Sequence, residues 1–262
     1  MDARSWQAQR SSFGTAADLY DRVRPSYHEA AIQWALDIRP ALDGTDGTVV
    51  DLGAGTGILS RQLLSLGYRC VPVEPDAAMR QRCDDRLREL FDTAAPKALD
   101  GSAEAIPLPD ASAEAAVAGQ AYHWFDPTKA HPEIARVLRP GGVFAPVWNV
   151  RDETEPWVAE LTRVLRGRDG SGIHAGWQGV SLEDHFHTTE QATFRFAVRH
   201  TPDSLIDLLR SRSYYLTGSP RRRAVLEREL RELLAGHPDL AGREEFELPY
   251  VTVAYRARRK PD

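Results

Sequence analysis

The feature that most constrains the fold of this chain is a glycine loop that directly follows an apolar run. Residues 48–52, TVVDL, are typical of a short strand covered on both faces. Gly53, Gly55 and Gly57 come next, and residues 58–67, ILSRQLLSLG, have the spacing of an amphipathic helix. Glycines of this kind let the backbone come close to a ligand. The loop therefore predicts a site for a dinucleotide, a phosphate or another nucleoside cofactor.

Strand and helix patterns alternate along the first part of the chain. After the glycine loop, strands are expected at 68–74, 96–101, 113–119 and 143–149, and helices at 76–90 and 126–138. Strands separated by single helices need crossover connections, so a parallel sheet with helices on both faces follows. Farther on, helices are expected at 155–167, 204–216 and 221–236, and strands at 193–201 and 245–259. We expect a doubly wound α/β sheet of seven strands, with a helical cap or lid from the C-terminal half.

Composition narrows the classes of protein. The 262 residues are 42% hydrophobic and 27% charged, which is ordinary for a soluble globular protein. The net charge of -5 argues against a broad basic surface for nucleic acid. The apolar runs are too short to span a membrane, and residues 1–12 lack the apolar core of a signal peptide. We expect a cytoplasmic protein without a nucleic-acid or membrane partner.

The loop chemistry favours one kind of cofactor. Its spacing is G-x-G-x-G, whereas the dinucleotide fingerprint G-x-G-x-x-G needs glycine where Ile58 stands, and no P-loop lysine follows. Asp51 would repel a phosphate but would attract an ammonium and a sulfonium. Glu74, at the end of the second expected strand, can accept hydrogen bonds from ribose hydroxyls, as in sites for NAD and for S-adenosylmethionine. The loop thus indicates a partly cationic nucleoside cofactor.

Four segments together resemble, in order and spacing, the motifs of class I S-adenosylmethionine-dependent methyltransferases of the small-molecule type 11 kind. They are VVDLGAGTG, VEPDAAM, GSAEAIPLPDASAEAAVAGQAYHWFD and RVLRPGG. The resemblance covers residues 13–150 closely and extends more loosely to the end, where LPYVTVAYRARR looks like the family's last strand. It implies a Rossmann-like core with an N-terminal segment in residues 1–150. Residues 151–262 would supply cap helices, at about 155–167 and 204–236, and an antiparallel last pair of strands in the same domain.

The resemblance also implies contacts to S-adenosylmethionine and its product S-adenosylhomocysteine. Asp51 and the backbone from Gly53 to Gly55 would hold the amino acid end of the cofactor, and Glu74 would hold the ribose. Further positions that match the family's cofactor contacts are Tyr20, Arg24, Ala54, Gly57, Pro75, Met79, Ser102, Ala103, Glu104 and Gln120. Ser102 stands where many relatives have an aspartate.

Candidate substrate residues follow the expected fourth strand. Residues 120–126, QAYHWFD, lie where open α/β sheets place their ligands. His123 is the candidate general base, because the ordinary pKa of histidine is near the working pH. The other candidate substrate contacts are Tyr122, Trp124, Trp148, Asn149, Tyr214 and Tyr215. Methyl transfer from a sulfonium is an in-line displacement, in which positioning supplies much of the rate.

Several of these side chains have a structural alternative: a helix cap, a solvated or salt-bridged charge, a turn, or core packing. This applies to Asp51, Glu74, Arg24, Ser102, Ala103, His123, Tyr214 and Tyr215. A metal site is not expected at His174, His185 and His187, because only two neighbouring carboxylates would complete it.

The sequence therefore predicts an S-adenosylmethionine-dependent methyltransferase, a monomer or homodimer, that acts on an oxygen, nitrogen or carbon atom of a small molecule in specialised metabolism. One alternative is a nicotinamide-dependent oxidoreductase, against which Ile58 and Asp51 argue. The other is a non-catalytic regulatory protein that binds S-adenosylmethionine, because displacement chemistry does not require a protein base.

Overall fold

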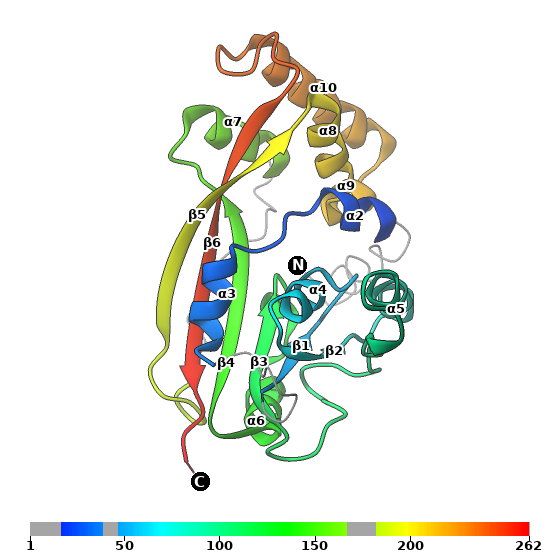
Figure 1. Cartoon of the computed structure of the whole chain (residues 1–262). Helices are drawn as coiled ribbons and strands as arrows, with labels where there is room; N and C mark the ends of the chain where they lie inside the picture. Colours follow the sequence, from blue (N-terminus) through cyan, green and yellow to red (C-terminus); the bar gives the residue numbers. More distant parts are fainter. Residues whose placement is uncertain (1–16, 39–46, 167–181, 262) are drawn as a thin grey trace. The chain divides into compact units, whose positions relative to one another are not determined.

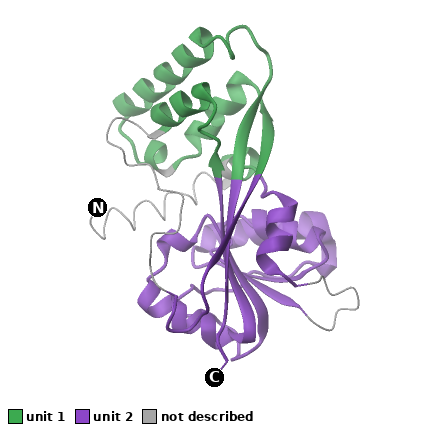
Figure 2. Cartoon of the chain, turned by 90° about the vertical axis from the view of Figure 1, so that its left-hand side faces the viewer, with its two compact units in different colours: residues 1–25, 150–174, 195–251 green, residues 26–149, 175–194, 252–262 purple. Residues whose placement is uncertain are grey.

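The computed structural model describes residues 17–38, 47–166 and 182–261. Two compact units make up the chain (Figure 2). Unit 1 comprises residues 1–25, 150–174 and 195–251, and unit 2 comprises residues 26–149, 175–194 and 252–262. In the described part, no helix is long and apolar enough to cross a bilayer.

Six strands form one sheet in the order β2-β1-β3-β4-β6-β5 (Figure 1). Their bounds are β1 Thr48–Leu52, β2 Arg69–Val73, β3 Ala113–Gly119, β4 Leu138–Arg151, β5 Glu190–His200 and β6 Phe246–Arg258. β1 pairs in parallel with β2 and β3, and β3 pairs in parallel with β4. β6 runs antiparallel to β4, because Arg259 N–H donates to the Gly142 carbonyl while Asp152 N–H donates to the Pro249 carbonyl. The expected mixed α/β class is confirmed.

The expected strand at 96–101 is wrong, so the described sheet has six strands instead of seven. This segment forms only an isolated parallel bridge between Val73 and Leu99. Its start cannot pair regularly, because Pro96 has no N–H and the Ala98 N–H donates to the Asp84 carboxylate at 2.7 Å. A side chain of the neighbouring helix has taken the place of a strand partner.

In the described part of unit 2, three α-helices connect the strands: α4 Ile58–Ser65, α5 Ala77–Phe91 and α6 Pro127–Val137. A further helix, α3 Glu29–Leu36, precedes β1. Asp76 caps α5 by accepting hydrogen bonds from two backbone N–H groups, and Asp126 caps α6, in which proline follows at the first helical position. Val49, Val117 and Val147 pack in one cluster with the buried side chains of α3 and α4. Alternation along the strands turns the neighbouring residues to the opposite face of the sheet.

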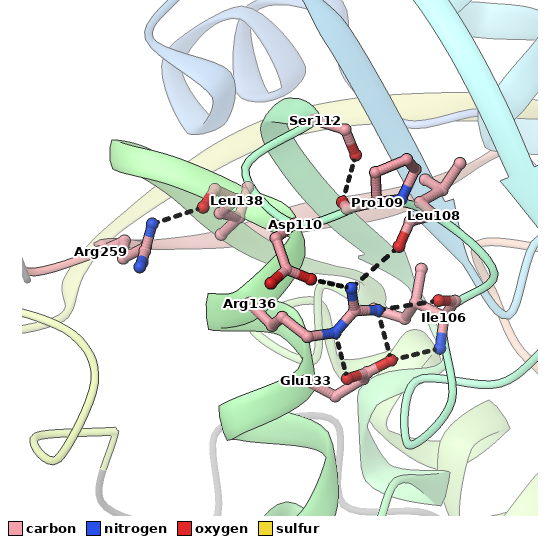
Figure 3. Close-up of polar contacts among 9 residues, drawn as sticks. All are labelled: Ile106, Leu108, Pro109, Asp110, Ser112, Glu133, Arg136, Leu138 and Arg259. Carbon is pink, nitrogen blue, oxygen red and sulfur yellow. Dashed lines mark hydrogen bonds and ion pairs between the residues drawn. The ribbon is translucent and has the colours of Figure 1, made fainter.

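A network around Arg136 fastens the loop before β3 to α6 (Figure 3). The Arg136 guanidinium donates to both carboxylate oxygens of Glu133, at 2.8 Å each, and to Asp110 at 2.6 Å. It also donates to the carbonyls of Ile106 and Leu108, at 3.0 and 2.9 Å. Glu133 in turn accepts a hydrogen bond from the Ile106 N–H at 2.8 Å. One side chain thus replaces the backbone pairing that this irregular loop lacks.

Unit 1 is a helical cluster on the ends of three strands. Its α-helices are α2 Ala17–Val23, α7 Pro156–Arg166, α8 Pro202–Arg210, α9 Ser213–Leu216 and α10 Pro220–Gly236. Leucines of α7, α8 and α10 share one buried core with Trp157 and Phe246. The single helix expected at 204–216 is two helices, because the Ser211 hydroxyl donates to the Leu208 carbonyl at 2.7 Å and the chain turns there.

Candidate cofactor site

The glycine loop between β1 and α4 places its three glycines in different surroundings. Gly53, Gly55 and Gly57 have φ angles of 67°, 58° and 83°, a region that other residues rarely adopt. A Cβ on Gly57 would lie 2.7 Å from the Cys83 sulfur, and one on Gly53 would lie 2.8 Å from the Ala121 Cβ. A Cβ on Gly55 would meet nothing within 4 Å. Gly53 and Gly57 therefore permit close packing within the protein, whereas Gly55 faces open space.

Glu74 follows β2, and its buried carboxylate fastens the glycine loop to that strand. Oε2 accepts a hydrogen bond from the Gly55 N–H at 2.9 Å, and Oε1 accepts one from the Asp76 N–H at 2.9 Å. The backbone adds to this connection. The Val73 carbonyl accepts hydrogen bonds from the N–H groups of Gly53 and Ala54, at 2.9 and 3.1 Å. The arrangement puts a carboxylate beside the one glycine of the loop that faces open space.

Asp51 is a second carboxylate of this region, and only 1% of it is exposed. Its Oδ2 accepts a hydrogen bond from the Ser60 hydroxyl of α4 at 2.6 Å, whereas Oδ1 is buried without a hydrogen-bond partner among the described residues. Burial, the largest cause, together with the negative charge of Glu74 raises the pKa of Asp51 to about 7, against the hydrogen bond from Ser60, which lowers it. No side chain caps the first turn of α4, so the capping role considered for Asp51 is not observed.

The start of α5, which follows β2, is the next segment with predicted cofactor contacts. Pro75 is exposed, and Asp76 accepts hydrogen bonds from the Ala78 and Met79 N–H groups at 3.0 and 2.9 Å. The Met79 side chain is buried. This segment offers a polar first turn with an apolar side chain behind it.

Residues 102–105 form a tight turn after the isolated bridge. Ser102 and Ala105 exchange two backbone hydrogen bonds at 3.1 and 3.2 Å, and Ala103 is buried. The Glu104 carboxylate accepts a hydrogen bond from the Asp126 N–H at 2.8 Å. Glu104 thereby connects this turn to the start of α6, which holds both segments at the same end of the sheet.

Gln120 directly follows β3 and has a φ of 56°, which is uncommon for a residue other than glycine. Its side-chain amide donates to the Asn149 carbonyl at 2.8 Å. The Asn149 side chain accepts a hydrogen bond from the Thr252 hydroxyl at 2.7 Å and donates to the Ser26 carbonyl at 3.0 Å. These contacts fix the backbone where β3 and β4 end, and strained backbone of this kind gathers at functional sites.

His123 lies in the short 3-10 helix Tyr122–Trp124 that follows β3. Both of its ring nitrogens are buried without a hydrogen-bond partner in the part of the chain that is described. Burial lowers the pKa of His123 to about 4, so the ring is neutral near pH 7. Its ring lies 4.9 Å from that of Trp124, measured between centroids. A neutral imidazole with two unused positions can exchange hydrogen bonds with a ligand.

Tyr122 and Trp148 belong to an aromatic core. The Tyr122 hydroxyl is hydrogen-bonded to the His131 ring at 2.8 Å, and burial raises its pKa to about 12. Tyr122 makes edge contacts with Phe144 and Trp148, and Trp148 is fully buried. Their predicted contact with substrate stays a prediction.

Four predicted site residues belong to unit 1. Tyr20 falls within α2, and the Arg24 guanidinium donates to the Ser211 carbonyl at 3.4 Å. Tyr215 donates to the Glu227 carboxylate at 2.6 Å, and Tyr214 packs against the leucine core. These contacts show how unit 1 holds the last three side chains, and their ligand roles stay predictions.

Of the three histidines considered for a metal site, His185 and His187 are among the described residues. His174 lies outside the described residues, and within them no cluster of three or more His, Cys, Asp or Glu residues has the geometry to hold a metal ion.

Two residues that the sequence did not single out complete the loop. The Ser60 hydroxyl donates a hydrogen bond to Asp51, and Gly57 packs against the sulfur of Cys83. Burial raises the pKa of the Cys83 thiol well above its usual range, so Cys83 acts as a small apolar side chain. One sequence feature could have pointed to Ser60: it is a polar residue on the buried face of α4, beside Leu59 and Leu63.

Known proteins are similar to this chain over part or most of its length. The family model described as a methyltransferase domain matches residues 50–145. An uncharacterized methyltransferase of Mycobacterium tuberculosis is 44% identical over 246 residues, which cover 94% of this chain and 95% of that protein. A malonyl-[acyl-carrier protein] O-methyltransferase of Pectobacterium atrosepticum is 31% identical over 140 residues, or 53% of this chain and 52% of its own.

A solved structure supports the same grouping. A protein of Anaeromyxobacter dehalogenans, described as a candidate type II methyltransferase, aligns with a TM-score of 0.63 and 25% identity. The alignment covers 91% of this chain and 99% of that one. The glycine loop, the acidic residue Glu74 after β2 and these relatives all point to the same family. The chain therefore belongs to the class I S-adenosylmethionine-dependent methyltransferase family.

Proposed function

We propose that the protein transfers a methyl group from S-adenosylmethionine to a small-molecule acceptor. The observation that carries the proposal is the pairing of Gly55, which faces open space, with two buried carboxylates, Asp51 and Glu74. A loop lined by carboxylates disfavours a phosphate and favours a cofactor with an ammonium, a sulfonium and ribose hydroxyls. The alternative of a nicotinamide-dependent oxidoreductase requires a pyrophosphate beside these same charges.

The donor set fits each part of that cofactor. The buried Oδ1 of Asp51 lacks a hydrogen-bond partner among the described residues and would receive the ammonium group. Glu74 would accept hydrogen bonds from the ribose, and Gly53, Ala54 and Gly57 would shape the loop around it. The adenine would meet the segments of Pro75, Met79, Ser102, Ala103 and Glu104, and Gln120 would lie beneath the methionine portion. Tyr20 and Arg24 are proposed as further cofactor contacts on the family resemblance alone.

The bound cofactor would supply an electrophilic methyl group, and the protein's task would be positioning. The acceptor atom must lie about 3 Å from that methyl, opposite the sulfur. His123 would accept a hydrogen bond from the acceptor and take its proton, because its ring is neutral near pH 7 and both ring nitrogens are unpaired among the described residues. With a pKa of about 4 it would be a weaker base than an ordinary histidine. Trp124 would line the same space. Tyr122, Trp148 and Asn149 would fix its walls.

The acceptor is proposed as a small molecule, with an oxygen atom as the first acceptor to test. The support is the printed activity of the Pectobacterium relative, an O-methyltransferase that matches half of this chain. We also propose action in the cytoplasm, in keeping with the two free cysteines, Cys70 and Cys83. We propose a monomer or homodimer. A role in specialised metabolism would follow from the identity of the acceptor.

Calorimetric titration with S-adenosylmethionine and with NAD tests the proposal. Wild-type protein is expected to bind the sulfonium cofactor with micromolar affinity, and Glu74→Ala is expected to weaken binding about a hundredfold, because two ribose hydrogen bonds to a charged acceptor are lost. Glu89→Ala is the matched control, because Glu89 is 54% exposed and pairs with Arg86 at i,i+3 on the surface of α5. Binding of NAD alone would refute the methyltransferase proposal. Cofactor binding without transfer to any acceptor would favour the regulatory alternative.

A further inference from the structure

Arg80, in the first turn of α5, has a side chain that reaches beyond its own helix. Its Nη1 donates to the Glu74 carbonyl at 2.7 Å and to the Pro75 carbonyl at 3.1 Å. Its Nη2 lies 3.2 Å from the Asp100 carboxylate, and only 19% of the side chain is exposed. Side chains of an α-helix lean toward its N-terminus, so the guanidinium returns to the segment before α5. One side chain thus connects this segment with the loop at Asp100.

The position of Arg80 is one that a helix alone disfavours for a cation. The N-terminus of a helix carries the positive end of the macrodipole and N–H groups without intrahelical partners. Asp76 accepts hydrogen bonds from two of those N–H groups. The Arg80 donors go instead to carbonyl oxygens outside the helix, those of Glu74 and Pro75. The charge of Arg80 is therefore matched to the segment that precedes α5.

Glu74 is held through both its backbone and its side chain. Its N–H donates to the Leu99 carbonyl at 3.1 Å, and its carbonyl accepts the hydrogen bond from Arg80. Its carboxylate accepts hydrogen bonds from the Gly55 and Asp76 N–H groups, at 2.9 Å each. Fixing the backbone on both sides of the Glu74 Cα limits where the carboxylate can lie. Arg80 supplies the fixed point on the carbonyl side.

The second arm of the guanidinium reaches the loop that follows the isolated bridge between Val73 and Leu99. Asp100 follows Leu99 and comes two residues before Ser102, where the tight turn 102–105 begins. Asp100 is 75% exposed, and an exposed ion pair contributes little to stability. The two carbonyl contacts of Arg80 therefore carry most of its effect, and they act on the side of Glu74.

We propose that Arg80 is a positioning residue of the cofactor site, which fixes Glu74 in the orientation that receives the ribose hydroxyls. The inference rests on the proposed function, because that proposal assigns the ribose to Glu74. A carboxylate that is already oriented loses less conformational freedom when a ligand binds, so its positioning is measured as affinity. Arg80 acts through Glu74 and makes no contact with the ligand itself.

A double-mutant cycle on the full chain tests this action by calorimetric titration with S-adenosylmethionine. Arg80→Met is expected to weaken binding about tenfold, and Glu74→Ala about a hundredfold. Because Arg80 acts through Glu74, the double variant is expected to bind about a hundredfold more weakly than wild type, instead of about a thousandfold. Losses that multiply, or an unchanged affinity in Arg80→Met, would overturn the proposal.

Two further variants support the cycle. Arg88→Met is the matched control, because it removes the same charge from the same helix at a position that is 64% exposed. It is expected to bind as wild type does, and a loss equal to that of Arg80→Met would overturn the proposal. Arg80→Lys enters the same cycle if Arg80→Met does not fold. It keeps the charge but lacks the planar fork, so a loss of about threefold is expected.

Hydrogen exchange without ligand separates this inference from the proposed function. The Gly55 and Asp76 N–H groups donate to the Glu74 carboxylate, so in Arg80→Met both are expected to exchange about tenfold faster, while the amides of β1 keep their wild-type rates. A purely structural role would accelerate both sets together, and unchanged rates at Gly55 and Asp76 would overturn the positioning of Glu74. Wild-type protein that binds no S-adenosylmethionine would refute the proposed function, and the exchange rates would still decide whether Arg80 fixes Glu74.

Discussion

Arg136 in unit 2 and Arg151 in unit 1 are both half-buried arginines, yet their surroundings are opposite. Arg136 donates to two carboxylates and two carbonyls, and its pKa is raised by Glu133 and Asp110 (Figure 3). Arg151 donates once, to Thr162, and burial lowers its pKa. The first side chain is satisfied by the fold, whereas the second has donors that the described fold does not use.

The same contrast separates two carboxylates of unit 2. Arg136 lowers the pKa of Glu133, whereas burial raises that of Asp51 to about 7 and leaves its Oδ1 without a hydrogen-bond partner in the described chain. Satisfied polar groups contribute to stability, and unsatisfied buried ones reduce it until a ligand arrives. The comparison therefore divides this protein's polar residues into those that build the structure and those that await a ligand.

The largest expected effect concerns Asp51. Its pKa is raised above the unfolded value, so between pH 4 and 7 the folded state binds more protons and stability falls as pH rises. The slope is about 1.4 kcal/mol per pH unit, or roughly 4 kcal/mol over that range. Urea unfolding at several pH values measures it, and Asp51→Asn should remove this component. A wild-type stability that rises steadily from pH 4 to 7, unchanged in slope by the substitution, would contradict the assignment.

Replacing the two arginines sharpens the comparison directly. Arg136→Met should lower the free energy of unfolding by about 3 kcal/mol, because a network of charged hydrogen bonds is lost. Arg151→Met should lower it by less than about 1 kcal/mol, because one hydrogen bond is lost and a repulsion is relieved. Urea unfolding of both variants measures the two losses. Arg88→Ala is the surface control, because Arg88 is 64% exposed. Equal losses at Arg136 and Arg151 would break the comparison.

A smaller effect is expected in the glycine loop. Gly57→Ala should destabilise by about 2 kcal/mol, since its Cβ would lie 2.7 Å from the Cys83 sulfur in addition to the strain of a positive φ. Gly55→Ala bears only the strain, about 1 kcal/mol, but its Cβ would enter the space assigned to the cofactor. Thermal unfolding and S-adenosylmethionine titration of both variants should show Gly57→Ala as the less stable and Gly55→Ala as the weaker binder. The reverse order would refute the division of roles within the loop.

Local signals in the sequence were sufficient for much of the fold. The caps Asp76 and Asp126, the glycine loop and the strand at 113–119 are where their patterns predicted them, because each depends on neighbours in sequence. The prediction of a strand at 96–101 was wrong because the Ala98 N–H bonds to Asp84, a residue outside the sequence window from which the strand was predicted. The break at Ser211 depends on a back-bonded hydroxyl that a helical period does not reveal.

The candidate site divides in the same way. Glycine spacing and the acidic residues Asp51 and Glu74 are legible in sequence because they follow strand ends. Which polar atom has a partner and which lacks one is a property of packing. The Ser60 hydrogen bond to Asp51 and the two unpartnered ring nitrogens of His123 therefore required three-dimensional contacts. Tyr215 shows the converse, because its candidate ligand role competes with a hydrogen bond to Glu227.

The most direct test of the central claim is a crystal structure of the protein with S-adenosylhomocysteine. The account predicts ribose hydroxyls within about 3 Å of the Glu74 carboxylate and the amino acid end beside the glycine loop, on the side of Gly55. A ligand bound elsewhere, or one whose ribose makes no contact with Glu74, would contradict it.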